Sequence, residues 1–212
     1  MTWLSPSFPV GAFSYSHGLE WAVHEGIVRS PDDLHDWIED LIAHGSGWND
    51  AVLLAESWRA AGEHDAVRLR AASELGEALA PSSERQLETM QMGTAFLECA
   101  RAWNNAVAGE LDGAAPYPVA IGTVAARMNA GLEETLIAFL HAFASNLVSA
   151  VLRLGTFGQS QAVAILARLE PALLDAAGRA AHSTLDDLGS ATIAADIASM
   201  RHETMHSRLF RS

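Results

Sequence analysis

Apolar residues recur along most of the chain at spacings of three and four positions, the period of an α-helix with one buried face. The clearest run includes Leu132, Leu136, Phe139, Phe143 and Leu147. No segment alternates apolar and polar residues over six or more positions between turn signals, so we predict no strand. Alanine and leucine also far outnumber valine and isoleucine. Together these patterns predict an all-α protein.

Helix start and stop signals divide this pattern into elements. Ser30, Pro31 and Asp33 provide a side-chain cap, a proline in the first turn and an acid near the positive end of the helix dipole, and Gly45 ends that helix. Applied along the chain, such signals predict helices at about 16–26, 30–44, 49–62, 64–80, 83–108, 119–128, 132–154, 160–169, 171–188 and 191–207. Residues 109–118, rich in glycine and proline, form the predicted internal linker. We therefore expect residues 1–212 to form a single compact domain of eight to ten helices.

The charged residues exclude several kinds of chemistry. All 13 basic residues are arginine, so a P-loop lysine, a Schiff-base lysine and a kinase-type lysine are excluded. The net charge of −13 argues against a nucleic-acid partner, because phosphate binding needs clustered cations. A single cysteine and an N-terminus without a signal-peptide pattern indicate a reducing, cytoplasmic location.

One stretch has the composition of a membrane span. The 18 residues between Glu134 and Arg153 include no Asp, Glu, Lys or Arg. They do include a histidine, an asparagine and two serines, and no basic residue flanks the start. We interpret this stretch as a core helix of a globular protein rather than a membrane span, with His141 as a hydrogen-bonded core histidine.

A metal-binding pattern lies near the end of the chain. His202, Glu203 and His206 match H-E-x-x-H, which on a helix places two imidazoles one turn apart for zinc with a glutamate as general base. His202 and His206 are therefore candidate metal ligands, and a zinc hydrolase is the alternative function. However, none of the six residues that follow is His, Asp or Glu, so a third ligand has to come from a distant segment. A helix end with exposed polar residues is the simpler interpretation. His17 and His24, seven residues apart, are interpreted as a surface pair.

Both ends of the sequence carry unusual segments. Near the start, Phe13 and Tyr15 lie among glycines and hydroxyl residues, and the sequence ends in Arg208-Leu209-Phe210-Arg211-Ser212. Phe and Arg are frequent anchors in protein interfaces, so segment 208–212 is a candidate docking element for a partner. The composition agrees equally well with a tail that folds back on its own domain.

These two ends carry a resemblance to a known family. Residues 5–20, the pair Arg153-Leu154 with Phe157-Gly158-Gln159, and residues 196–204 followed by 208–212 resemble the signature segments of the urease accessory protein F family. The resemblance implies an all-helical, dimeric, non-enzymatic adaptor. It implies as partners urease accessory protein D, the nickel-carrying urease accessory GTPase and apo-urease, with nickel at most in transit and no resident cofactor.

The resemblance also implies roles for particular residues. The resemblance places a docking tail for protein D at about 207–212, with Arg208, Leu209, Phe210, Arg211 and Ser212 as its contact residues. His202 and Glu203 help to build the surface that precedes it. Phe13 and Tyr15 belong to the other signature segment and are further candidate partner contacts. This sequence departs from the family at His206, where tyrosine is common, and before residue 196, where a proline is usual. The H-E-x-x-H pattern is then a by-product of one divergent residue.

Overall fold

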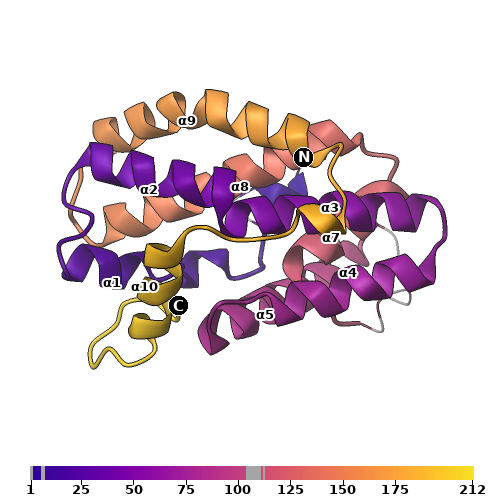
Figure 1. The fold of residues 1–212 in the computed structure, drawn as a ribbon, viewed down its shortest axis with the longest axis horizontal. Coiled ribbons are helices and arrows are strands. Elements are labelled where there is room, and N and C mark those ends of the chain that lie inside the picture. The colour runs from indigo at the N-terminus through magenta and orange to yellow at the C-terminus, as the bar shows by residue number, and fades with distance from the viewer. Residues whose placement is uncertain (1, 6–7, 104–110, 112) are drawn as a thin grey trace.

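The computed structural model describes residues 2–5, 8–103, 111 and 113–212, and the elements found in them are all helical, which confirms the predicted class. Figure 1 shows the chain from its indigo start to its yellow end. The elements are η1 (Thr2–Leu4), η2 (Ala12–Ser14), α1 (Leu19–His24), α2 (Pro31–His44), α3 (Ser46–Gly62), α4 (Ala66–Ala78), α5 (Ser83–Ala100), α7 (Tyr117–Arg127), α8 (Leu132–Arg153), α9 (Gln159–Ala180), η3 (Leu185–Asp187) and α10 (Ile193–His202).

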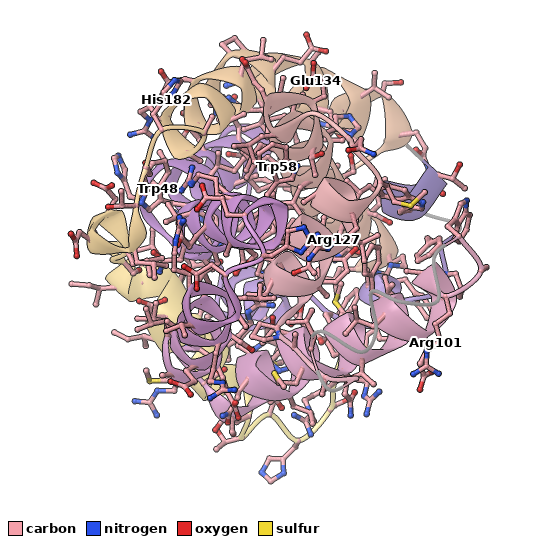
Figure 2. The ribbon with its side chains drawn as sticks, turned by 90° about the vertical axis from the view of Figure 1, so that its right-hand side faces the viewer. Trp48, Trp58, Arg101, Arg127, Glu134 and His182 are labelled. Carbon is pink, nitrogen blue, oxygen red and sulfur yellow. The ribbon has the colours of Figure 1, made fainter. Side chains whose placement is uncertain are left out.

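Helix α3 lies at the centre of the arrangement. It packs against α2, α8 and α9 on one side and against α4 and α7 on the other, while α5 packs on α7 and α4 (Figure 1). Two tryptophans of α3 also fix loops: the indole of Trp48 donates to the carbonyl oxygen of Asp187, and that of Trp58 to the carbonyl oxygen of Ala130, each at 2.9 Å (Figure 2). The short helix α1 and the last helix α10 pack together and bring segments near the two ends of the sequence side by side, 19–24 and 193–202.

The predicted start of α2 is confirmed. Ser30 accepts a hydrogen bond from the Asp33 amide at 3.1 Å, and the Asp33 carboxylate accepts from the Ser30 amide at 2.9 Å. This reciprocal capping box satisfies two backbone donors that the first turn leaves free, and Pro31 occupies the first helical position. The helix ends at His44 before Gly45, as its sequence predicts.

The predicted break at Pro171 is wrong, because α9 runs without interruption from Gln159 to Ala180. A proline inside a helix removes one backbone hydrogen bond, which leaves the carbonyl of the residue four positions earlier without its partner. Here Pro171 and Ala167 are both exposed, so water can reach that carbonyl. The segment after Ala180 forms turns and η3 rather than a continuation of the helix.

Three further boundaries differ from the prediction. Helix α3 starts at Ser46 instead of Asn49, because the Asn49 side chain accepts a hydrogen bond from the distant Gly189 amide instead of capping a helix. Helix α5 ends at Ala100 and residues 101–103 form a turn, so the predicted continuation of this helix is wrong at its start. The rest of that continuation, 104–108, lies outside the described residues, as do residues 109, 110 and 112 of the predicted linker. Helix α10 ends at His202 instead of continuing to 207.

Helix α8 contains the apolar stretch noted in the sequence. It is long and apolar enough to cross a membrane by length and composition, but half of its most apolar window is buried inside the protein. It packs against α9, α3 and α7, as expected of a core helix of a globular protein. His141 is exposed on its outer side, so the prediction of a core histidine is wrong. The same turn of α8 has a buried side, on which Leu140 lies, and an exposed side, on which His141 lies.

Gly18 allows α1 to approach α10. Its backbone is left-handed, with φ of 76°, and a Cβ at this position would lie 2.5–2.7 Å from backbone atoms of Ala198 and Ser199. Only glycine combines this conformation with so close a contact. The start of α1 is therefore fixed against α10, directly beside the last residues of the sequence.

Candidate partner-binding site at the clasp

Residues 208–212 fold back on residues 13–20, and we call these two segments together the clasp. The Ser16 amide donates to the carbonyl oxygen of Ser212 at 2.7 Å, and the Ser16 hydroxyl donates to the same oxygen at 2.5 Å. The Arg211 amide donates to the carbonyl oxygen of Ser14 at 2.8 Å. Figure 1 shows the end of the chain beside α10 and near the start of α5. Of the two interpretations of the tail, the structure has the one in which it packs on its own domain.

Glu20 of α1 anchors the tail. Its two carboxylate oxygens accept hydrogen bonds from the Leu209 amide at 2.7 Å and the Phe210 amide at 2.9 Å. The second oxygen also lies 3.1 Å from Nε2 of His202. Glu20 is 7% exposed and His202 is fully buried, so these polar groups depend on one another for hydrogen bonding.

Glu84, in the first turn of α5, completes this arrangement. It lies 2.7 Å from Nδ1 of His202 and forms an ion pair with Arg208. The imidazole of His202 therefore lies between two carboxylates, with one at each ring nitrogen. His202 joins α1, α5 and α10 at the point where the tail begins.

The zinc-site geometry predicted from H-E-x-x-H is not formed. Because α10 ends at His202, His202 and His206 do not lie one helical turn apart, and His206 is exposed. Glu203 instead accepts hydrogen bonds from the Ser83 hydroxyl at 2.6 Å and the Ser83 amide at 2.8 Å. These bonds lower the pKa of Glu203, the one from the Ser83 hydroxyl most strongly. Glu203 is thus a cap on the start of α5, where a helix favours an anion.

A second buried carboxylate, that of Glu88, binds Ser212. Glu88 of α5 accepts from the Ser212 hydroxyl at 2.6 Å, lies 2.8 Å from Nε2 of His17, and forms an ion pair with Arg85 at 2.5 Å. Burial alone would raise the pKa of Glu88, but the neighbouring charge of Arg85 and the hydrogen bonds lower it to about 2. Burial and Arg85 lower the pKa of His17. His17 is buried and lies outside a helix, so the prediction of a surface pair with His24 is wrong.

The predicted contact residues divide into two groups. Tyr15, Phe210, Ser212 and His202 are buried, whereas Phe13 and Leu209 are 69% and 61% exposed. Arg208 and Arg211 are also exposed, and Glu203 is half-buried. The buried members fix the backbone, and the exposed ones are available to a partner.

Arg153 at the end of α8 links the two segments of the clasp. Its guanidinium lies over the ring of Phe210, 4.4 Å from the centroid, and donates to the carbonyl oxygen of Phe13. The hydroxyl of Tyr15 donates to the side chain of Gln91 at 2.9 Å, and Arg211 lies 5.9 Å from the centre of the Tyr15 ring. The clasp is thus held against α5 and α8 by cation–π contacts as well as by hydrogen bonds.

Sequence reasoning did not assign roles to Glu20, Glu84, Glu88 and Arg85. Apart from the local Arg85–Glu88 pair and the Arg85–Asp50 pair, the side-chain partners that hold the clasp are between 68 and 190 positions away from these residues along the chain. The one local signal was a pair of opposite charges three positions apart on α5, which is common on helix surfaces.

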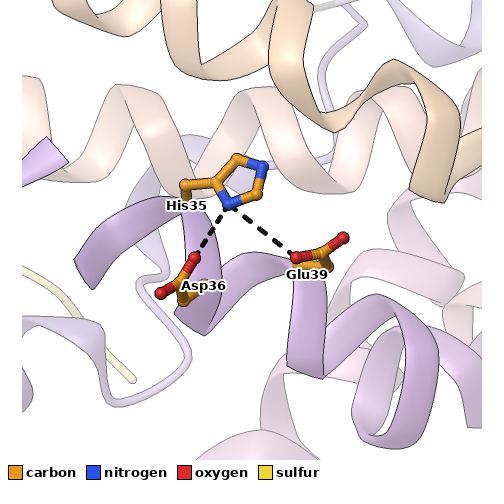
Figure 3. Close-up of side chains that lie close together, drawn as sticks. All are labelled: His35, Asp36 and Glu39. Carbon is orange, nitrogen blue, oxygen red and sulfur yellow. Dashed lines mark hydrogen bonds and ion pairs between the residues drawn. The ribbon is translucent and has the colours of Figure 1, made fainter. Parts of the chain in front are cut away.

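Another group of potential metal ligands lies on α2, away from the clasp. Nδ1 of His35 is 3.0 Å from Asp36 and 3.8 Å from Glu39 (Figure 3). The ligand atoms of these three side chains lie within 4.8 Å of one another, the one such group among the described residues. Both carboxylates are exposed, and the 3.0 Å contact is an ordinary hydrogen bond from the imidazole, so nothing beyond proximity indicates a metal here.

Comparisons with known proteins agree with the resemblance to the urease accessory protein F family. The UreF family model matches residues 28–170. Over all 212 residues the chain is 55% identical to urease accessory protein UreF 1 of Brucella canis, 56% identical to UreF of Agrobacterium fabrum and 52% identical to UreF of Mesorhizobium japonicum. These alignments cover 92%, 94% and 94% of the relatives' own lengths and include both segments of the clasp. The chain belongs to the UreF family of urease accessory proteins, and its role is in urease maturation.

Proposed function

We propose that this protein is a non-enzymatic adaptor that links the nickel-carrying urease accessory GTPase and accessory protein D to apo-urease for nickel insertion. The observation that supports the proposal best is the clasp, in which two exposed apolar side chains project from a backbone anchored by buried carboxylates. The adaptor acts as a cytoplasmic homodimer, has no resident cofactor, and handles nickel at most in transit.

Phe13 and Leu209 have the properties of interface anchors. Both are large and exposed, and Leu209 has Arg208 as its neighbour. The backbone amide of Leu209 is fixed by Glu20, so a partner does not have to order this segment when it binds. Pre-ordering lowers the entropic cost of association, and apolar or arginine anchors contribute much of the binding energy in such interfaces. We assign this surface to protein D.

The absence of lysine supports a proposal in which the partner GTPase, and not this protein, binds and hydrolyses the nucleotide. A chain without lysine has no P-loop lysine for nucleotide phosphates, so the nucleotide chemistry belongs to the partner GTPase. The alternative, a zinc hydrolase, has no support in the described residues, because His202 and Glu203 are used in hydrogen bonds and His206 faces away into solvent.

Co-purification with protein D tests the assignment of the surface. Leu209→Ser and Phe13→Ser remove exposed apolar side chains and leave the hydrogen bonds of the clasp in place. Leu174→Ser is the matched control, because Leu174 is a leucine of α9 that is 54% exposed and lies outside the clasp. We expect each clasp variant to lose most co-purification and urease activation while its thermal unfolding midpoint stays at that of the control. Undiminished complex formation by both clasp variants would refute the assignment.

A further inference from the structure

The carboxylates beneath the clasp are used inside the protein. Glu20 and Glu88 are 7% and 2% exposed, and Glu84 is half-buried. Glu20 accepts hydrogen bonds from two backbone amides of residues 208–212, and Glu88 accepts one from the Ser212 hydroxyl. Glu84 contacts the buried ring of His202. Little of their surface therefore reaches solvent, although the chain as a whole carries a net charge of −13.

The charged side chains that do reach solvent on the clasp are arginines. Within its two segments, Arg208 and Arg211 are the exposed charged residues, and Arg153, which links the segments, is exposed as well. Arg208 pairs with Glu84. Neither Arg153 nor Arg211 has a carboxylate within ion-pair distance among the residues that the structure describes. The clasp is thus a locally positive surface on an acidic protein.

An arginine accompanies each exposed apolar side chain of the clasp. Arg153 donates to the carbonyl oxygen of Phe13, and Arg208 directly precedes Leu209. A partner that covers Phe13 and Leu209 therefore also covers guanidinium groups. Removing an unpaired cation from water is costly unless the partner supplies an opposite charge.

Arg211 has the fewest contacts within the protein of these three arginines. Its backbone amide donates to the carbonyl oxygen of Ser14 at 2.8 Å, which fixes the position of the residue. Its guanidinium lies 5.9 Å from the centre of the Tyr15 ring, at the outer limit of a cation–π contact. The N–H donors of this guanidinium have no hydrogen-bond acceptor in the part of the chain that the structure describes. Arg211 thus has a fixed backbone and a side chain that is available to a partner.

A carboxylate is the group that matches a guanidinium best, because its two oxygens accept two parallel hydrogen bonds. A phosphate has similar geometry, but a nucleic acid or an anionic membrane would bring many negative charges close to a chain of net charge −13. A wholly apolar surface would leave the arginines without partners. The contact face that fits the clasp is therefore apolar at its centre and acidic at its edge.

We propose that the partner bound at the clasp presents an apolar pocket edged by Asp or Glu side chains, and that Arg211 pairs with one of these carboxylates. The apolar pocket receives Leu209 and Phe13, and Arg153 and Arg208 face the acidic edge beside them. The proposal rests on the assignment of the clasp surface to protein D, and it names the chemistry of the contact face of protein D. Surfaces with positive charge at that edge are repelled, so the pairing also contributes specificity.

Binding of protein D to the purified protein at two salt concentrations tests this pairing. Biolayer interferometry measures the association rate and the affinity at about 50 mM and about 500 mM sodium chloride, since salt screens charges that act through solvent. At low salt we expect Arg211→Glu to weaken the affinity at least about tenfold, mainly through slower association, and Arg211→Gln to have a smaller effect. At high salt the difference between the wild-type protein and Arg211→Glu should fall below about threefold.

Arg70→Glu is the matched control, because Arg70 is an exposed arginine of α4 outside the clasp and its substitution changes the net charge by the same amount. Arg211→Gln, which introduces no negative charge, keeps the test valid if Arg211→Glu lowers the thermal unfolding midpoint. Equal affinities of Arg211→Glu and Arg70→Glu at low salt would overturn the proposal. A wild-type protein that does not bind protein D would refute the adaptor assignment and the pairing with it, whereas binding that is indifferent to Arg211 refutes the pairing alone.

An exchange of charges tests the partner's side of the interface. Single Asp→Arg and Glu→Arg substitutions on protein D should include one that restores the binding of Arg211→Glu at low salt. Failure of every such substitution to restore binding would mean that no carboxylate of protein D faces Arg211, and the proposal would be wrong.

Discussion

At the scale of single residues, Glu20 shows what the sequence reveals and what it hides. The pattern of the last residues drew attention to His202, Phe210 and Leu209, and all three lie in one site with Glu20. Their roles differ from the first interpretation, because a metal-ligand pattern says nothing about the carboxylates that a fold brings to each imidazole nitrogen. Glu20 itself stands in an ordinary amphipathic segment, and its partners are almost the whole chain away.

Glu20→Gln should destabilise the protein by about 1–3 kcal/mol, the usual cost of leaving buried donors without an acceptor. A glutamine offers one acceptor oxygen, whereas Glu20 accepts from the Leu209 and Phe210 amides and contacts His202. Urea denaturation monitored by circular dichroism measures the loss. Glu25→Gln, at an acid of the same segment that is exposed, is the control, and equal stability of the two variants would contradict the role given to Glu20.

Asp50→Asn should stabilise the protein increasingly as the pH rises. Burial raises the pKa of Asp50 to about 7 in the folded protein, while in the unfolded chain Asp50 loses its proton near its usual value of 3.8. Between these values the native state binds more protons, so the wild-type protein loses stability as the pH increases. Asparagine has no proton to lose. We expect its advantage to grow by about 1–3 kcal/mol between pH 5 and 8 in denaturation experiments. A difference between the proteins that is independent of pH would contradict the raised pKa.

At the scale of elements, local sequence signals located most helices. They gave wrong boundaries where contacts with distant residues determine where a helix begins or ends. The capping box at Ser30 is local and was predicted with its correct boundaries. The end of α10 was predicted five residues too late, because Glu203 leaves the helical pattern to cap the start of α5. Similarly, Asn49 was expected to start α3 but binds the loop at Gly189. Where a residue suits two structural roles, its tertiary contacts determine which role it takes. A single sequence does not show those contacts.

Pro171→Ala should stabilise the protein by about 1–2 kcal/mol. Alanine restores the missing backbone donor inside α9 and has a much better helix propensity, although it also gives the unfolded chain more freedom. Thermal and urea unfolding measure the gain. Pro81→Ala is the matched control, since Pro81 lies between α4 and α5 outside any helix and should bring no such gain. A destabilised Pro171→Ala variant would mean that the proline at this position is needed for packing of α9 on α2 and α8.

At the scale of the whole molecule, the clasp closes the chain on itself. Ser16 and Ser212 are 196 residues apart and share two hydrogen bonds, and Glu88 of α5 binds the same terminal serine. Sequence analysis predicted an all-α protein correctly, together with most of its helices. It left open whether residues 208–212 extend to a partner or fold back, since composition alone does not distinguish these arrangements.

Removal of residues 208–212 should lower the free energy of unfolding by at least about 3 kcal/mol, the sum expected from one buried phenylalanine and several hydrogen bonds. At this size, that loss corresponds to a fall in the unfolding midpoint of at least about 6 °C. Differential scanning calorimetry measures the change. Leu209→Ser is the control, because it alters the exposed surface and keeps the clasp. A deletion as stable as this control would mean that the tail contributes nothing to the fold.

The clasp also has a consequence for synthesis of the protein. Residues 13–20 are synthesised long before their partners at 208–212, so Glu20 and Glu88 lack their backbone and hydroxyl donors until residues 208–212 have been made. The docking surface that we propose at Leu209 therefore forms only after the helices described above have been synthesised. A chain that lacks residues 208–212 does not present this surface to the partners proposed above.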